Sequence, residues 1–145
     1  MILKFFFFLK DILLSKLRNV NNNTLNHLAN SQLSSKIRSL DLTCLNKFDE
    51  TTLLNSFPKF PNISVLYLSS TTGVTDKVIN TIAGNCRLLQ KIYLSGQSAL
   101  TDQSIIQLSK NCRNLSVLNV SKCNSKQQKI IIFHLIFYFE KQVLS

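Results

Sequence analysis

Residues 63–88 read ISVLYLSSTTGVTDKVINTIAGNCRL, and residues 89–114 repeat their apolar pattern as LQKIYLSGQSALTDQSIIQLSKNCRN. The same interval of 26 residues continues on both sides, and the residues that begin each unit are Ile37, Ile63, Leu89 and Leu115. Three and five residues after these anchors the chain again carries large apolar side chains, namely Leu40, Leu66, Ile92, Leu118, Leu42, Leu68, Leu94 and Val120. A pattern that recurs at a fixed interval of this length predicts stacked repeats, each of which packs on its neighbours.

Each unit combines two kinds of periodicity. Between Val65 and Ser69 the side chains alternate in the period of two that is typical of a short strand with one buried face. In the next segment Ile79, Ile82 and Cys86 stand three and four residues apart, which is the stripe of an amphipathic helix. Because the strands recur once per unit in the same direction, we expect them to lie parallel. The helices then cover one face of the sheet and leave the other open.

The expected fold is therefore α/β with one parallel sheet. We place strands near 11–15, 39–43, 65–69, 91–95 and 117–121, and helices near 76–85 and 102–111. Thr75 and Thr101 directly precede these two helices, and each is followed by an Asp. A threonine oxygen at this position accepts the free amides of the first turn, and a carboxylate suits the positive end of the helix. Antiparallel pairing among the three central strands would contradict this prediction.

The repeats divide the chain into a terminal segment, a repeat domain and a tail. We assign residues 1–8 to an N-terminal cap segment, 9–123 to repeat units near 9–36, 37–62, 63–88, 89–114 and 115 onward, and 124–145 to an irregular apolar tail or terminal cap. The first unit is a fainter copy, whose apolar residues are Leu9, Ile12, Leu14, Val20, Leu25, Leu28 and Ala29. For the tail two explanations stay open: a terminal helix that plugs the last unit, or a truncated or misread gene.

The motifs of the central units resemble the cysteine-containing class of leucine-rich repeat. The residues that carry the resemblance are Cys86-Arg87-Leu88-Leu89, Ile92-Tyr93-Leu94, Leu100-Thr101-Asp102, Ile105, Leu108 and Cys112. Such repeats are typical of F-box proteins with leucine-rich repeats, so the resemblance implies a ribonuclease-inhibitor-like horseshoe arc with a concave sheet. The chain departs from the pattern where the repeat's other cysteine is expected, because that slot holds Leu45, Thr71 and Gln97 before Cys123. Phe60 also replaces the cysteine at the end of its helix.

The charge balance raises a second class of function. The 17 Lys and Arg residues outnumber the 7 Asp and Glu residues and give a net charge of +10, which invites a nucleic-acid hypothesis. Several of the cations instead fall near expected helix C-termini, where they offset the helix dipole: Lys59, Arg87, Lys110 and Arg113. No run of basic residues is interleaved with aromatic ones. We therefore rank nucleic acid well below protein as a partner.

Neither catalysis nor metal binding is predicted. Cys86 and Cys112 occupy a repeated apolar slot, so we expect both thiols to be buried, reduced and unliganded. The chain has no C-x-x-C pair, and its two histidines, His27 and His134, have no nucleophile or carboxylate at a motif spacing. We expect no enzyme activity, no cofactor and no metal site.

The open face of the predicted sheet is the candidate binding site. Alternation places three columns of side chains on it, which begin at Asp11, Leu13 and Ser15 and recur in each strand. Members of a column are direct neighbours because parallel strands lie about 4.8 Å apart. The residues that we predict to bind a protein are Asp41, Val65, Tyr67, Ser69, Lys91, Tyr93, Ser95 and Asn119. Adjacent tyrosines with polar surroundings are typical of a binding hot spot, although tyrosine also favours strands for its own sake.

The resemblance implies a substrate-recognition role in an SCF-type ubiquitin ligase. A ligase adaptor would bind only if a missing segment supplied an F-box, because residues 1–36 are already used by the cap and the first unit. The alternatives are a free-standing repeat protein that acts as a regulator or inhibitor, and a basic scaffold for nucleic acid. We expect a cytoplasmic or nuclear protein. Ile130 to Phe139 is too short a stretch to span a membrane.

Overall fold

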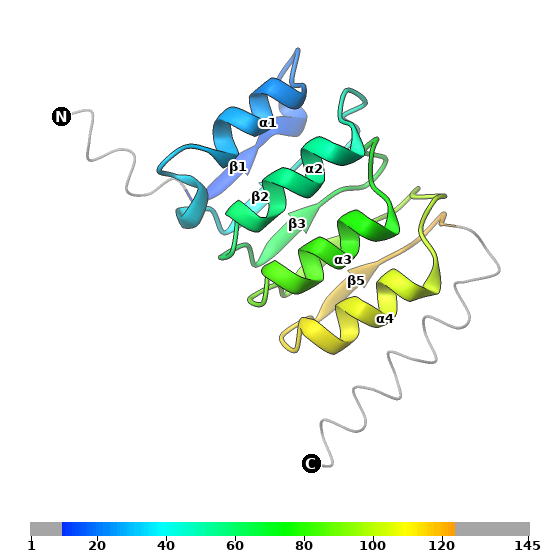
Figure 1. Ribbon diagram of the computed structural model, residues 1–145. Helices are drawn as coiled ribbons and strands as arrows, with labels where there is room; N and C mark the ends of the chain where they lie inside the picture. The colour runs from blue at the N-terminus through cyan, green and yellow to red at the C-terminus, as the bar shows by residue number, and fades with distance from the viewer. Residues whose placement is uncertain (1–9, 124–145) are drawn as a thin grey trace.

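The computed structural model describes residues 10–123 (Figure 1). The predictions for the cap at 1–8 and for the tail at 124–145 concern residues outside this range. Strands and α-helices alternate as β1 (Asp11–Leu13), α1 (Asn22–Ala29), β2 (Ser39–Asp41), α2 (Glu50–Ser56), β3 (Val65–Tyr67), α3 (Asp76–Asn85), β4 (Lys91–Tyr93), α4 (Asp102–Asn111) and β5 (Val117–Asn119). The connections include three short 3-10 helices, which are η2 (Leu14–Lys16), η3 (Ser34–Lys36) and η4 (Phe57–Lys59).

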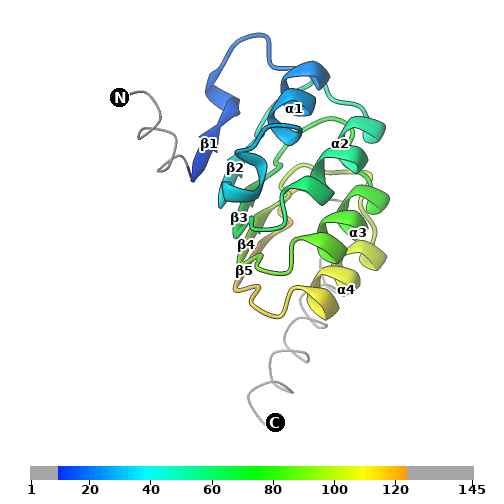
Figure 2. The same cartoon turned by 60° about the vertical axis from the view of Figure 1, so that its left-hand side comes forward.

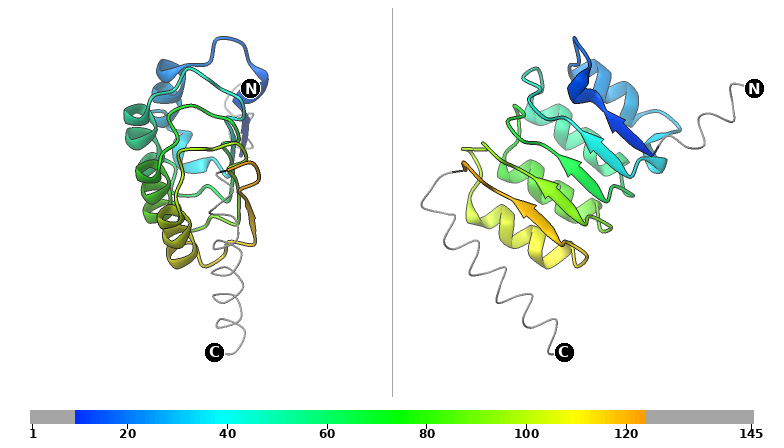
Figure 3. Two further views of the ribbon diagram at one scale, coloured as in Figure 1. Left: turned by 90° about the vertical axis from the view of Figure 1, so that its right-hand side faces the viewer. Right: turned by 180° about the vertical axis from the view of Figure 1, so that it is seen from behind.

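The five strands form one parallel sheet in the order β1-β2-β3-β4-β5. Each strand pairs with the next without a register shift, so that Leu40 lies beside Leu66, and Leu66 beside Ile92. All four helices lie on the same side of the sheet (Figure 2), and the opposite side faces outward (Figure 3). The predicted α/β architecture with a parallel sheet is confirmed. Helices α3 and α4 have the bounds that the sequence predicts, and the arrangement is compatible with a solenoid.

The strands begin where predicted but end two residues earlier. A left-handed residue follows shortly after each of the last four strands, and these residues are Cys44 (φ 59°), Ser70 (φ 53°), Gly96 (φ 78°) and Lys122 (φ 58°). Left-handed backbone cannot continue a strand, so the chain turns at the same place in each unit. Hydrogen bonding between units nevertheless continues to this point, since the Ser70 amide donates to the Ser95 carbonyl at 2.9 Å.

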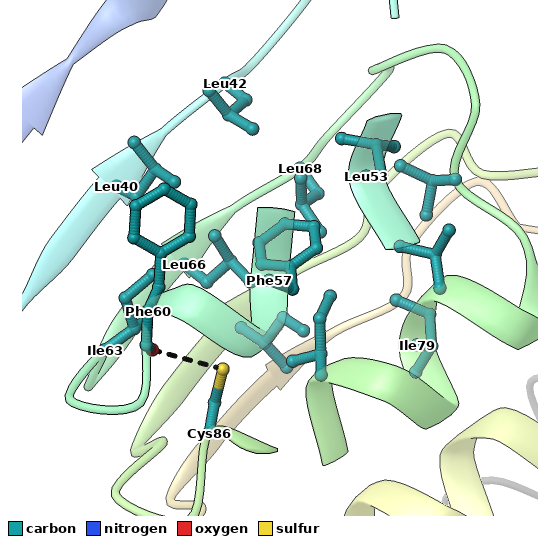
Figure 4. Packing of buried hydrophobic residues seen from close by; sticks show 14 of the residues in the cluster. Leu40, Leu42, Leu53, Phe57, Phe60, Ile63, Leu66, Leu68, Ile79 and Cys86 are labelled. Atoms are coloured by element: carbon teal, nitrogen blue, oxygen red, sulfur yellow. Dashed lines mark hydrogen bonds between the residues drawn. The ribbon is translucent and has the colours of Figure 1, made fainter. Parts of the chain in front are cut away.

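The apolar core lies between the sheet and the helices (Figure 4). The central residues of β2, β3 and β4 are fully buried, as are the core residues of α3. Two aromatic side chains fill the space beside η4, where the rings of Phe57 and Phe60 meet edge to face at 6.4 Å. The Cys86 thiol donates to the Phe60 carbonyl oxygen at 3.5 Å, so Phe60 and Cys86 remain neighbours although Phe60 replaces a cysteine. The repeated apolar slots are thus the core, as the periodicity predicts.

A row of buried hydrogen-bond donors joins consecutive units at the slot of Thr71, Gln97 and Cys123. The Thr71 hydroxyl donates to the Leu42 carbonyl at 2.7 Å, and the Gln97 amide donates to the Leu68 carbonyl at 2.6 Å. The Cys123 thiol makes the equivalent bond to Leu94 at 3.1 Å. Thr71, Gln97 and Cys123 are all buried. The hydroxyl, the amide and the thiol therefore each donate a hydrogen bond to the carbonyl that directly follows the strand of the preceding unit.

The helix starts show one correct prediction and one wrong one. The Thr101 hydroxyl oxygen accepts the Gln103 amide at 3.3 Å, as predicted for a cap of α4. Thr75 makes no such bond, because its hydroxyl donates instead to the Glu50 carboxylate of the preceding unit at 2.5 Å. Thr101 likewise donates through its hydroxyl to Asp76 at 2.5 Å and through its amide at 2.9 Å. In α2 and α3 the acidic residue at the start of the helix, Glu50 or Asp76, therefore accepts a hydrogen bond from the threonine that precedes the next helix.

Candidate functional site

The open face consists of three columns that run across the strands. In the description that follows, the open face means Asp11, Ser39, Val65, Lys91 and Val117, then Leu13, Asp41, Tyr67, Tyr93 and Asn119, then Ser15, Thr43, Ser69, Ser95 and Ser121. None of these residues is buried, whereas the central residues of β2, β3 and β4 are fully buried on the helix side. The structure therefore brings all eight predicted binding residues onto one face, where Lys91 is exposed and the other seven are half-buried.

Tyr67 and Tyr93 stack at the centre of the open face. Their ring centroids lie 4.6 Å apart and the rings are within 5° of parallel. This separation follows from the register, because Tyr67 pairs directly with Tyr93 across neighbouring parallel strands. Each ring restricts the rotation of the other, so the pair presents a preordered aromatic surface. A partner that binds there does not need to fix two freely rotating side chains, which lowers the entropic cost of association.

Asp41 lies beside Tyr67 and is held in place by its neighbours. Its carboxylate accepts the Ser15 hydroxyl at 2.6 Å and the Thr43 amide at 2.9 Å. Partial burial alone raises the pKa of the Asp41 carboxyl, but these hydrogen bonds and the nearby Lys16 ammonium outweigh burial and lower the pKa below its usual value. Asp41 is therefore a fixed negative charge on this side of the tyrosine pair.

Asn119 occupies the corresponding place on the other side, next to Tyr93. Its side-chain oxygen accepts the Ser121 amide at 3.0 Å, which is the same bond to the second following residue that Asp41 makes with Thr43. Such a bond fixes the turn that follows the strand. The Ser121 hydroxyl also bonds to Ser95 at 3.0 Å and links two members of the third column. The aromatic pair is thus flanked by two polar side chains that are both held by hydrogen bonds.

The sequence did not reveal one hydrogen bond on this face. The bond between Ser15 and Asp41 joins the first two units, and it depends on rotamers that no spacing predicts. Leu13, which the sequence places in the middle column, lies beside Asp41 and is 46% exposed. Leu17, four residues later in the chain, is 58% exposed. Leu13 adds an apolar side chain to the open face on the far side of Asp41 from Tyr67.

The described residues offer no group of three or more His, Cys, Asp or Glu side chains that could hold a metal ion. His27 lies exposed on α1, while His134 falls outside the described range. Residues 10–123 also contain no helix that is long and apolar enough to cross a membrane.

The four cysteines are free, and their environments differ. Cys44 is exposed, whereas Cys86, Cys112 and Cys123 are buried, which confirms the predicted burial of Cys86 and Cys112. Burial raises the pKa of Cys86 to about 12 and that of Cys112 to about 11. Burial also raises the pKa of Cys123. A thiol reacts as the thiolate, so these three thiols are protected both by access and by protonation.

We predict that only Cys44 reacts with a thiol reagent in the folded protein, and that all four cysteines react after denaturation.

We also predict that stability depends on pH in the alkaline range. Because the folded pKa values of Cys86 and Cys112 lie above the unfolded value of 9.0, these thiols keep their protons in the folded protein at a pH where they lose them in the unfolded chain. This contribution to stability is complete below pH 9 and falls as the pH rises toward 11 to 12. Urea titrations at pH 8 and pH 10.5 measure the loss, with Cys44→Ser as a control that leaves it unchanged. Rapid modification of Cys86 in the native protein would contradict the prediction that only Cys44 reacts in the folded protein.

No protein-family model matches this chain, and no curated protein matches it significantly. Function is therefore inferred from the open face and from the sequence motifs alone.

Proposed function

We propose that this chain is a leucine-rich-repeat solenoid that binds a protein partner through the open, concave face of its sheet. The observation that carries this proposal is the stacked pair of Tyr67 and Tyr93, which is held between Asp41 and Asn119. Aromatic side chains dominate binding hot spots because they bury a large area with little loss of rotamer freedom. The polar flanks add direction and exclude unsuitable partners.

The charge of the open face favours protein over nucleic acid. The three columns contain two carboxylates, Asp11 and Asp41, and one ammonium group, Lys91. The excess of Lys and Arg over Asp and Glu therefore lies outside the open face. Nucleic-acid binding depends mainly on Lys and Arg that neutralise phosphates, so the open face does not suit it. A face of this composition suits a partner segment that is itself mixed in charge. The chain would act by binding and not by catalysis.

Within this class, we place the chain with the substrate receptors of SCF-type ubiquitin ligases. Cys86 and Cys112 support this assignment, because they fill one buried slot in successive units, as the cysteine-containing repeat implies. An F-box from another segment would then be required for contact with the ligase adaptor. The second candidate within the class is a stand-alone regulator or inhibitor. Both would act in the cytoplasm or nucleus.

An affinity purification from cells, followed by mass spectrometry, distinguishes these roles. Recovery of ligase adaptor and cullin peptides is expected for a substrate receptor, and a stable partner without them is expected for a stand-alone regulator. The recovery of ribosomal or chromatin proteins that disappear after nuclease treatment would instead indicate a nucleic-acid scaffold. The bait should carry intact Tyr67 and Tyr93 in one arm and the double alanine variant in the other. Only partners that the double variant loses are assigned to the open face.

We predict that Tyr67→Ala or Tyr93→Ala weakens partner binding by about 1–4 kcal/mol, because a large amphipathic surface is lost at the centre of the contact. The two rings are partly exposed, so folding should be affected much less. The matched controls are Lys77→Ala and Gln103→Ala, which change exposed residues of α3 and α4 on the opposite side. Titration calorimetry with the recovered partner and thermal melts of all four variants measure both effects. Loss of binding in the controls but not in the tyrosine variants would move the site to the helices.

A further inference from the structure

The two faces of the Tyr67 ring have different surroundings. Tyr93 stacks on one of them, with ring centroids 4.6 Å apart and planes within 5° of parallel. The strand order places Tyr93 on the β4 side of Tyr67 and Asp41 on the β2 side. The second face of the ring is therefore turned towards β2, where Asp41 is the paired residue. An aromatic face is electron-rich, so the ring and the carboxylate beside it both attract a cation.

The Asp41 carboxylate has acceptor capacity left for such a cation. Its Oδ2 atom accepts the Ser15 hydroxyl and its Oδ1 atom accepts the Thr43 amide, so each oxygen keeps a further acceptor site. Both donors are neutral. The Lys16 ammonium lies near, but within residues 10–123 Asp41 forms no ion pair. The two hydrogen bonds fix the direction of the carboxylate, so a partner meets a negative charge that is already oriented.

The lengths of the side chains on either side define the shape of a group that fits here. Tyr67 extends further from the sheet than Asp41, and paired residues of neighbouring strands lie about 4.8 Å apart. A flat group stacks on a ring at about 3.5–4.0 Å. Stacked on the outer part of Tyr67, such a group lies above Asp41 and can turn its edge to both carboxylate oxygens. Leu13, on the other side of Asp41, is 46% exposed and offers an apolar contact to a methylene chain.

We propose that the open face binds an arginine side chain of its protein partner, with the guanidinium stacked on Tyr67 and paired with Asp41. This inference rests on the proposed function and names the chemistry of the partner at that site. Arginine fits better than lysine, because a guanidinium is planar, weakly hydrated and has paired donors, whereas an ammonium is compact and strongly hydrated. The other end of the tyrosine pair is less suitable for a cation. Tyr93 is paired there with neutral Asn119, and Lys91 lies in the same strand as Tyr93.

A titration of the full chain with Nα-acetyl-arginine amide, followed by nuclear magnetic resonance, tests the inference without the partner. The probe should shift the amide signals of Asp41 and Tyr67 saturably. Nα-acetyl-citrulline amide has the same shape without the charge and should bind about tenfold more weakly. Asp41→Asn should weaken the arginine probe about tenfold as well. Asp11→Asn removes the same charge from another column of the open face and should leave binding unchanged.

Three results of this titration would overturn the inference: no saturable shift, equal binding of the arginine and citrulline probes, or binding of Nα-acetyl-lysine amide as tight as that of arginine. Thermal melts show whether Asp41→Asn remains folded. Tyr67→Leu is a second variant that keeps the carboxylate and its hydrogen bonds, and it should reduce the preference for arginine over lysine.

The partner recovered by affinity purification separates failure of this inference from failure of the proposed function. Asp41→Asn should weaken that partner about tenfold, because the charged contact is lost. A partner that the double tyrosine variant loses but that Asp41→Asn retains would overturn the arginine contact alone. A partner that both variants retain would overturn the proposed function.

Discussion

Replacing Gly73 with Ala is expected to lower the free energy of unfolding by about 2–5 kcal/mol, which is a large part of the stability of a small domain. Gly73 has a left-handed backbone (φ 77°), where a side chain is disfavoured. An added Cβ would lie 2.8 Å from the carbonyl carbon of Asp49 and 3.0 Å from the carbonyl oxygens of Asp49 and Phe48. All three atoms are backbone, so relief requires two neighbouring units to separate.

The other two glycines provide controls. A Cβ at Gly84, which is exposed in α3, would have no neighbouring atom within 4 Å, so Gly84→Ala should raise stability by about 0.5–1 kcal/mol. Gly96 is also left-handed, but its Cβ would meet the side-chain oxygen of Ser70 at 2.8 Å, and that hydroxyl can rotate away. Gly96→Ala should therefore lie between the other two. Urea denaturation followed by circular dichroism measures the order, and equal effects of Gly73→Ala and Gly84→Ala would refute the close approach between units.

Gln97→Met is expected to cost about 2–4 kcal/mol, because it replaces a buried double donor with an apolar side chain of similar length. The Gln97 amide donates to the Leu68 carbonyl at 2.6 Å and to the Thr71 carbonyl at 2.9 Å. Leu68 still accepts the Thr71 amide in the variant, at 3.2 Å in the present structure. The greater part of the cost therefore comes from the Thr71 carbonyl, which loses its donor inside the protein.

Thr71→Val is the matched control at the same slot of the preceding unit. The Thr71 hydroxyl donates to Leu42, whose carbonyl also accepts the Leu45 amide at 3.2 Å, so only one of two bonds is lost. We expect a smaller cost of about 1 kcal/mol. Thermal and urea unfolding of both variants compare the two slots directly. A larger loss in Thr71→Val than in Gln97→Met would contradict the assignment of the Thr71 carbonyl as the critical acceptor.

The sheet order, the strand starts and the bounds of α3 and α4 could be predicted because apolar side chains recur at fixed intervals. Periodicity reports which side of an element is buried, and burial of Leu66, Ile79 and Ile92 follows from it directly. Periodicity does not report which polar groups form hydrogen bonds with one another. Thr75 was assigned to its own helix, yet Glu50 of the neighbouring unit takes its hydroxyl. The competition between a local and an inter-unit acceptor depends on distances that the sequence does not contain.

The slot of Thr71 and Gln97 shows the same limit in the core. In the sequence these residues look like losses of a cysteine, because their side chains differ in size and polarity. In the structure both donate to the same kind of carbonyl that the Cys123 thiol binds. Three different side chains at this position donate a hydrogen bond, whereas Leu45 at the same position of an earlier unit has no donor, and a pattern of hydropathy cannot express this distinction. The neighbourhood of Tyr67 and Tyr93 could be predicted, since it needs only the strand register, whereas binding of a partner at these residues stays a prediction.

The left-handed turn residues and the buried donors Thr71, Gln97 and Cys123 recur at the same interval. Each of these units therefore supplies a donor to the preceding unit, and Leu68 and Leu94 supply the carbonyl acceptor for the following one. If residues 63–88 were deleted, the Gln97 amide would come to lie beneath Leu42, where the Thr71 hydroxyl now donates. A duplication of the same stretch would create one more copy of a junction that already exists. The breadth of the open face can therefore change during evolution by whole units, through recombination within a single gene, without new contacts having to arise.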